Sequence, residues 1–295
     1  MAYFATGPTV FRHRPGISRR FSARPRFSSA LDSCVRACNT SRPDAPASVA
    51  AVSLPQGVGS VPTLILFDID GTLLRTAGSG IAAMGRAGRA LYGDHFDERR
   101  VEYAGRLDPL IMADLLSLHG IEPTPAEMAR FRSAYREHLE RLMHEPAAGA
   151  GPCPGIIELL DALQSVRDVA LGVLTGNYPE TGAIKLRACR VAPERFPIAV
   201  WGCDSPHHPP AREHLPPVGM QRYAERFGRP IHASSVVIVG DTPHDVAAAR
   251  AHGCRSLAVA TGKFSVDELR AAGADRADPA LTATAEIVQW MLAHP

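Results

Sequence analysis

The sequence contains very little lysine and has no long apolar run. Lys185 and Lys263 are its two lysines among 32 basic residues, so arginine carries almost all of the positive charge. No apolar run approaches the roughly 18 residues of a membrane-spanning helix, so we expect no membrane partner. The six cysteines form neither a CxxC pair nor a zinc-ligand spacing. This pattern favours reduced thiols over a disulfide framework or a zinc site.

The charge that is present divides the chain into two regions. Residues 1–60 hold eight arginines and two aspartates, whereas the remainder holds 24 basic and 28 acidic residues. The larger region is mildly acidic, so we expect no nucleic-acid partner. Residues 1–60 lack periodicity and are predicted to be a disordered leader. The leader is either an organelle transit peptide or sequence upstream of the true start; the second reading predicts a cytoplasmic protein.

Five short apolar runs predict the strands of one sheet. Helical stretches separate the later runs and also follow the last one, and such alternation is typical of a parallel sheet covered on both faces. The predicted fold class is therefore α/β, with a Rossmann-like parallel sheet. The expected strands are Leu64–Phe67, Val169–Leu174, Ile198–Trp201, Val236–Val239 and Ser256–Ala260.

The interval between the first two strands is too long for a simple loop. It contains no convincing strand and shows helical runs near residues 79–92, 108–118, 125–144 and 155–164. We predict that residues 79–153 form an inserted all-helical cap with glycine-rich hinges. Residues 61–78 and 154–295 would then form the catalytic core.

Two aspartates follow the first strand, in the segment Asp68-Ile69-Asp70-Gly71-Thr72. Side chains alternate faces along a strand, so Asp68 and Asp70 project to the same side. They leave the carboxyl end of a buried strand, where open α/β sheets bind ligands. Two carboxylates this close repel each other, and a hard cation such as Mg²⁺ relieves that repulsion. One of them can then act as a nucleophile.

Three further polar segments each follow a predicted strand. They are Leu174–Asn177, the loop 202–213 that contains Arg212, and Gly240–Asp245. With the first motif they resemble the haloacid-dehalogenase-like hydrolase superfamily. The likeness is greatest to its phosphoglycolate-phosphatase-like branch, which carries a helical cap after the first strand, and it covers residues 63–295.

The resemblance implies a Mg²⁺-dependent phosphatase acting on a small soluble phosphate monoester. Asp68 matches the nucleophile that forms an aspartyl-phosphate, and Asp70 matches the general acid and base. Thr175 matches the hydroxyl that holds a phosphoryl oxygen. Asp241 matches a metal ligand, together with the Asp68 carboxylate and the Asp70 carbonyl, and Asp245 matches an outer acid that orients the site.

Other residues of the motifs suit phosphate binding. Gly71 and Gly176 let backbone N–H groups approach an anion closely. Asn177 lies just before a helix predicted to start at Pro179, and a helix amino end favours an anion. In the predicted cap, Arg106 either contacts a substrate anion or lies in a loop where Asp108 caps the next helix. Thr175 alone could reflect turn chemistry.

The cationic position of the family departs from its usual lysine. Arg212 is assigned to it, and Lys185 is the alternative. An arginine binds phosphate oxygens bidentately but differs from lysine in reach. A pattern much like a capping box is also present at Thr242, Pro243 and Asp245. Asp245 could therefore both cap a helix and orient the site.

Other functions stay open at this point. A sugar-phosphate mutase keeps both aspartates, whereas a 2-haloacid dehalogenase typically lacks the second one. A non-catalytic phosphate-sensing module would keep the site but not turnover. The chain is expected to act as a monomer or a homodimer.

Overall fold

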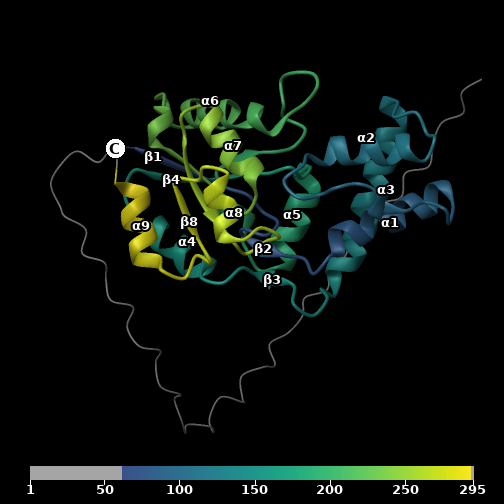
Figure 1. Cartoon of the computed structure of the whole chain (residues 1–295), viewed down its shortest axis with the longest axis horizontal. Helices are drawn as coiled ribbons and strands as arrows, with labels where there is room; N and C mark the ends of the chain where they lie inside the picture. The colour runs from purple at the N-terminus through teal and green to yellow at the C-terminus, as the bar shows by residue number, and fades with distance from the viewer. Residues whose placement is uncertain (1–61, 294–295) are drawn as a thin grey trace, which may run out of the picture. The chain divides into compact units, whose positions relative to one another are not determined.

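A computed structural model describes residues 62–293, so the predicted leader lies outside the described residues. This part of the chain forms a six-stranded sheet and a two-stranded one (Figure 1). Short 3-10 turns lie at Glu98–Arg100, Pro193–Arg195, Arg212–His214 and Ala233–Ser235. The strands are β1 (Thr63–Phe67), β2 (Leu74–Arg75), β3 (Gly151–Pro152), β4 (Val169–Leu174), β5 (Ile198–Val200), β6 (Val236–Gly240), β7 (Arg255–Val259) and β8 (Arg276–Asp278).

The larger sheet is entirely parallel, in the order β5-β4-β1-β6-β7-β8. β1 lies between β4 and β6, and all five of its residues are buried. A strand covered on both faces reads as a continuous apolar run, which is how the sequence predicted it. The α/β fold class and the parallel sheet are confirmed.

Helices cover both faces of this sheet. On one face Ile65 and Phe67 pack in a core with residues of α4 and α9, while Leu64 and Leu66 pack on the other face with residues of α6. The helices outside the predicted cap are α4 (Ile156–Gln164), α5 (Pro179–Ala188), α6 (Leu215–Phe227), α7 (Pro243–Ala251), α8 (Val266–Ala271) and α9 (Thr284–Leu292).

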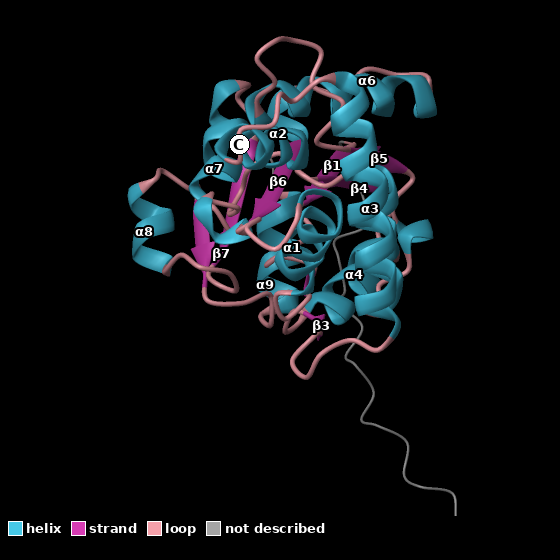
Figure 2. Cartoon of the chain, turned by 90° about the vertical axis from the view of Figure 1, so that its right-hand side faces the viewer, coloured by secondary structure: helices cyan, strands magenta, loops and turns pink. Residues whose placement is uncertain are grey.

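Three further helices fill the interval after β2. They are α1 (Ser79–Tyr92), α2 (Asp108–Leu118) and α3 (Pro125–His144), and they lie together on one side of the sheet (Figures 1 and 2). Their joint core includes Met84, Phe96 and Phe131. The helical character of this interval is as predicted. Its division from the core as a separate cap domain stays a prediction.

Several contacts tie this helical segment to the rest of the chain. β2 and β3 pair antiparallel and hold its two ends side by side. Arg132 of α3 forms two hydrogen bonds of 2.6 and 2.7 Å to the Glu180 carboxylate at the start of α5. The guanidinium of Arg132 also lies 3.9 Å from the ring centre of Tyr178.

The structure differs from the prediction at three short strands. β2 and β3 both lie inside the interval expected to hold no strand, so that expectation is wrong there. β2 and β3 have two residues each, too few for a period-2 pattern to be read. β8 was also missed, because in this edge strand Ala277 is buried while Arg276 and Asp278 are half-buried.

Candidate active site

The central strands bring three predicted site residues to one edge of the sheet. Phe67 is in register with Val173 of β4 and Val239 of β6, so the three strands end at the same level. The Asp68 amide donates to the Val239 carbonyl at 2.8 Å, and the Thr175 amide donates to the Val200 carbonyl at 3.0 Å. Asp68 and Thr175 are therefore anchored where β1 and β4 end, and Asp241 directly follows β6.

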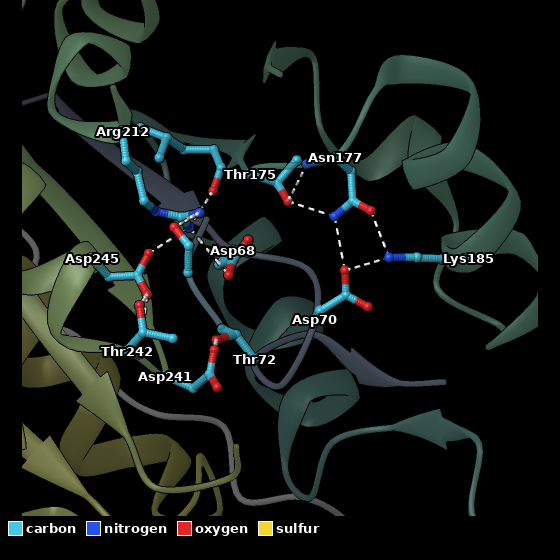
Figure 3. A network of polar contacts seen from close by, with 12 residues as sticks. Asp68, Asp70, Thr72, Thr175, Asn177, Lys185, Arg212, Asp241, Thr242 and Asp245 are labelled. Atoms are coloured by element: carbon cyan, nitrogen blue, oxygen red, sulfur yellow. Dashed lines mark hydrogen bonds and ion pairs between the residues drawn. The ribbon is translucent and has the colours of Figure 1, made fainter. Parts of the chain in front are cut away.

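Arg212 joins two of the acids through ion pairs. One guanidinium nitrogen lies 3.1 Å from Oδ2 of Asp68 and 2.5 Å from Oδ1 of Asp245 (Figure 3). All three side chains are buried. Burial raises the pKa of Asp68 to about 6; the Arg212 charge opposes this rise, and Asp245 adds to it. Arg212 thus supplies positive charge directly beside the predicted nucleophile.

Asp245 combines a capping role with an orienting role. It is the third residue of α7, and its Oδ2 accepts hydrogen bonds from the Thr242 amide at 3.1 Å and the Thr242 hydroxyl at 2.7 Å. Its other oxygen accepts from Arg212. Pro243 occupies the first turn, where a missing N–H costs nothing. The capping interaction at the start of α7 therefore also fixes the carboxylate that binds Arg212.

Three buried carboxylates form a group that suits a divalent cation. Oxygens of Asp68, Asp241 and Asp245 all lie within 4.8 Å of one another. Burial, reinforced by the charges of Asp68 and Asp245, raises the pKa of Asp241 to about 8. Crowded carboxylate oxygens are the donors that Mg²⁺ prefers, and a bound cation would relieve their repulsion. The Thr72 hydroxyl steadies Asp241 by donating to it at 3.3 Å.

Asp70 has a different set of partners. Its Oδ2 accepts a hydrogen bond of 2.6 Å from the Lys185 ammonium and one of 2.8 Å from the Asn177 side-chain amide. Asn177 also donates to the Thr175 hydroxyl at 2.8 Å and accepts from Lys185 at 2.6 Å. Burial lowers the pKa of Lys185, but the charges of Asp70, Tyr135 and Asp108 outweigh it and raise the pKa overall.

The structure therefore gives the two candidate cations separate places. Arg212 contacts Asp68 and Asp245. Lys185 contacts Asp70. Sequence reasoning treated them as alternatives for one role, and nothing in the pattern showed that both reach the site.

The predicted glycines lie where backbone approaches the acids or the helical segment. Gly71 has a φ of +81°, and a Cβ there would collide with the Asp241 carboxylate. A Cβ at Gly176 would collide with the Arg106 carbonyl. The Asp108 amide donates to the Gly176 carbonyl at 2.8 Å, so the loop 105–108 lies directly over the end of β4.

A cavity of about 400 Å³ opens beside these groups. Arg106 lines it, but its guanidinium pairs with Asp114 at 2.5 Å and also donates to the Glu102 carbonyl. A substrate contact by Arg106 stays a prediction. No sequence motif marks several further lining residues, among them Thr76, Tyr103, Tyr135 and Lys263.

Two named phosphatases are similar to this chain in sequence. The "Probable phosphatase IndB" of Dickeya dadantii is 29% identical over 213 residues, which cover 71% of this chain and 86% of that protein. The phosphoglycolate phosphatase of Rhodospirillum rubrum is 27% identical over 223 residues, covering 72% and 86%.

A solved structure supports the fold. CbbY from Rhodobacter sphaeroides in complex with phosphate superposes with a TM-score of 0.60 at 23% identity, covering 75% of this chain and 96% of that one. The family model described as haloacid dehalogenase-like hydrolase matches residues 65–259, which include all four motifs. The chain belongs to the haloacid dehalogenase-like hydrolase family.

Proposed function

We propose that the protein is a Mg²⁺-dependent phosphatase that hydrolyses a small soluble phosphate monoester through an aspartyl-phosphate on Asp68. The observation that carries this proposal is the convergence of Asp68, Asp241 and Asp245 around one point, with Arg212 beside the nucleophile. The similarity to named phosphatases supports it.

In the first half of the reaction an Asp68 oxygen attacks phosphorus, and the bond between phosphorus and the ester oxygen breaks. Asp70, in its protonated form, gives its proton to the departing alcohol oxygen. Arg212, and the amides near Gly71 and Gly176, would stabilise the charge on the phosphoryl oxygens. The Thr175 hydroxyl would hold one of those oxygens.

In the second half Asp70 is a carboxylate and takes a proton from water. The resulting hydroxide attacks phosphorus, inorganic phosphate leaves, and Asp68 is regenerated. Lys185 and Asn177, which both donate hydrogen bonds to Asp70, would fix the position of its carboxylate.

The metal would be held by the carboxylates of Asp68 and Asp241 and by the Asp70 carbonyl. When bound, Mg²⁺ supplies positive charge that offsets the anionic phosphate and nucleophile. Asp245 would act from outside that set, since both of its oxygens already accept hydrogen bonds.

The test is phosphate release from a panel of phosphomonoesters, measured with Mg²⁺ and with a chelator. We expect metal-dependent release, and a phosphoryl group on the Asp68 peptide when the reaction is quenched in acid. Isomerised sugar phosphates without net release would favour a mutase, and halide release from a 2-haloacid would favour a dehalogenase. Ligand binding without turnover would favour a sensing module.

Location and assembly are also proposals. Among residues 62–293 no helix combines the length and apolar character that crossing a membrane requires. A cytoplasmic enzyme that works as a monomer or homodimer stays our expectation, with import into an organelle as the alternative if residues 1–60 are a transit peptide.

A further inference from the structure

The helical segment supplies the wall of the cavity that faces the acids. Its lining side chains are mostly apolar or tyrosine, and they include Ile81, Met84, Tyr103, Ile111 and Tyr135. A volume of about 400 Å³ leaves room for the organic part of an ester beside its phosphate. This wall therefore decides which organic groups fit.

Two carboxylates interrupt this wall: Glu102, which is exposed and pairs with Lys263, and Asp108, which is buried. Asp108, the first residue of α2, lines the cavity and is only 7% exposed. Among the described residues its Oδ2 finds no hydrogen-bond partner. A buried polar atom without a partner costs about 1–3 kcal/mol, so native structures rarely leave one unexplained.

The basic side chains that line the cavity are all engaged by acids. Consequently a second anionic group on a substrate must compete with an acid for each of these cations, and it also meets Asp108. The pairs are Arg106 with Asp114 at 2.5 Å, Lys185 with Asp70 at 2.6 Å, Arg212 with Asp245 at 2.5 Å, and Lys263 with Glu102 at 3.3 Å.

We propose that Asp108 determines specificity by accepting a hydrogen bond from a hydroxyl or ammonium group on the organic part of the substrate. The site thereby selects against phosphate esters that carry a second anion, such as a carboxylate. This inference rests on the proposed phosphatase function and names its substrate class. It separates the chain from relatives named for phosphoglycolate, whose organic part is a carboxylate.

The surroundings of Asp108 agree with such a role. Burial raises its pKa to about 7; Lys185 opposes that rise, Asp70 adds to it, and the Tyr178 amide and Thr181 hydroxyl lower it. Either protonation form can accept a hydrogen bond from a hydroxyl. Because Tyr178 and Thr181 lie at the start of α5, Asp108 also helps to hold α2 against α5. The test must therefore measure substrate selectivity and not rate alone.

The experiment compares kcat/KM for matched phosphate esters of two and three carbons that end in methyl, hydroxyl, ammonium or carboxylate. For the wild type we expect the hydroxyl and ammonium esters to exceed the methyl ester by about tenfold to a hundredfold, as one hydrogen bond to a charged group allows. We expect the carboxylate ester to be the slowest.

The variant Asp108→Asn should reduce the differences in kcat/KM among these esters. We expect the ratio of kcat/KM for the carboxylate ester to kcat/KM for the methyl ester to rise about tenfold over the wild-type ratio. Asp267→Asn is the matched control, because it removes an aspartate from an exposed position on α8 and should leave the ranking unchanged.

Each outcome decides the inference. Equal or faster hydrolysis of the carboxylate ester by the wild type, or an unchanged ranking in a folded Asp108→Asn variant, would overturn it while the phosphatase proposal stands. If the variant does not fold, the wild-type ranking alone decides. Release of phosphate from none of the esters would overturn both proposals.

Discussion

Asp68 and Asp70 are two residues apart, yet each is held by a different cation. Arg212 lies 3.1 Å from Asp68, and Lys185 lies 2.6 Å from Asp70. Asp68 is buried, whereas the side chain of Asp70 is 41% exposed and lines the cavity. Neighbouring carboxylates in unlike surroundings can take different roles, so the environments support nucleophile at one position and proton transfer at the other.

Replacing the nucleophile should remove turnover without unfolding the protein. Asp68→Asn keeps the shape of the side chain but cannot form the acyl-phosphate, so we expect phosphate release to fall by at least about 10³-fold. Thermal melting should be unchanged or higher, since one buried negative charge is gone. Release above one tenth of the wild-type rate would exclude Asp68 as the nucleophile.

Removing Arg212 should destabilise the fold. The variant Arg212→Ala leaves Asp68 and Asp245 buried without their shared cation, and breaking such a pair costs about 3–5 kcal/mol. Urea unfolding measures this loss. Arg212→Lys should lose less, because it keeps the charge, and added Mg²⁺ should recover part of the loss in both variants. Unchanged stability of Arg212→Ala would contradict the ion pairs described here.

Asp108 should make stability depend on pH. Its pKa is about 7 in the folded protein and about 4 in an unfolded chain, so between these values the folded state binds more protons. Its contribution to the free energy of unfolding therefore decreases as pH rises from about 4 to 7. Wild type should lose stability relative to Asp108→Asn over this window.

Urea titrations at several pH values in that window give the comparison, with Asp267→Asn as the reference for an exposed aspartate. A difference between wild type and Asp108→Asn that does not change with pH would show that folding leaves the pKa of Asp108 unchanged.

At the scale of the elements, the position of the loop 105–108 depends on Gly176, which directly follows Thr175 at the end of β4. A Cβ on Gly176 would collide with the Arg106 carbonyl, so Gly176→Ala must push this loop away from Thr175 and Asn177. A displacement of about 1 Å can cost about 10²-fold in rate, and we expect kcat/KM to fall by about 10- to 100-fold.

The matched control for that loop is Gly120→Ala, at the end of α2. A Cβ there meets nothing within 4 Å, but φ is +71°, so the change strains the backbone without touching the site. It should lower stability by about 1 kcal/mol and leave kcat/KM unchanged. Equal kinetic effects from the two variants would remove the argument for close packing at Gly176.

The elements were predictable to different degrees for physical reasons. β1 and β6 are buried on both faces, so apolar runs marked them, and Thr242 with Pro243 marked the start of α7. β8 was not predictable, because an edge strand with Arg276 and Asp278 on either side of Ala277 lacks an apolar run.

The partners within the site were less predictable than its members. Asp68, Asp70 and Asp241 were predicted as site residues because each closely follows a strand, and Arg212 was assigned from the family resemblance to the loop after β5. The pairing of Lys185 with Asp70 joins positions far apart in the chain, and it depends on how α5 packs. The burial of Asp108 depends likewise on how the loop 105–108 meets β4. Contacts between residues far apart in the chain produce no local sequence pattern from which they could be predicted.

For the whole molecule, a bound cation should stabilise the fold. Mg²⁺ that binds the folded state alone at 100 times its Kd adds about 2.7 kcal/mol to the free energy of unfolding. We expect a higher Tm with Mg²⁺ than with a chelator, and no such difference in Asp241→Asn. Identical melting of the wild type under both conditions would contradict a metal site formed by these carboxylates.

The central position of β1 has a consequence for amide exchange. The Asp68 amide is hydrogen-bonded to the neighbouring strand β6, and residues 63–67 are buried between β4 and β6. Amides in such a position exchange with solvent deuterium only when the whole domain opens. The Asp68 carboxylate is thus attached to the part of the backbone that opens last. Local unfolding elsewhere in the chain should therefore leave its position unchanged.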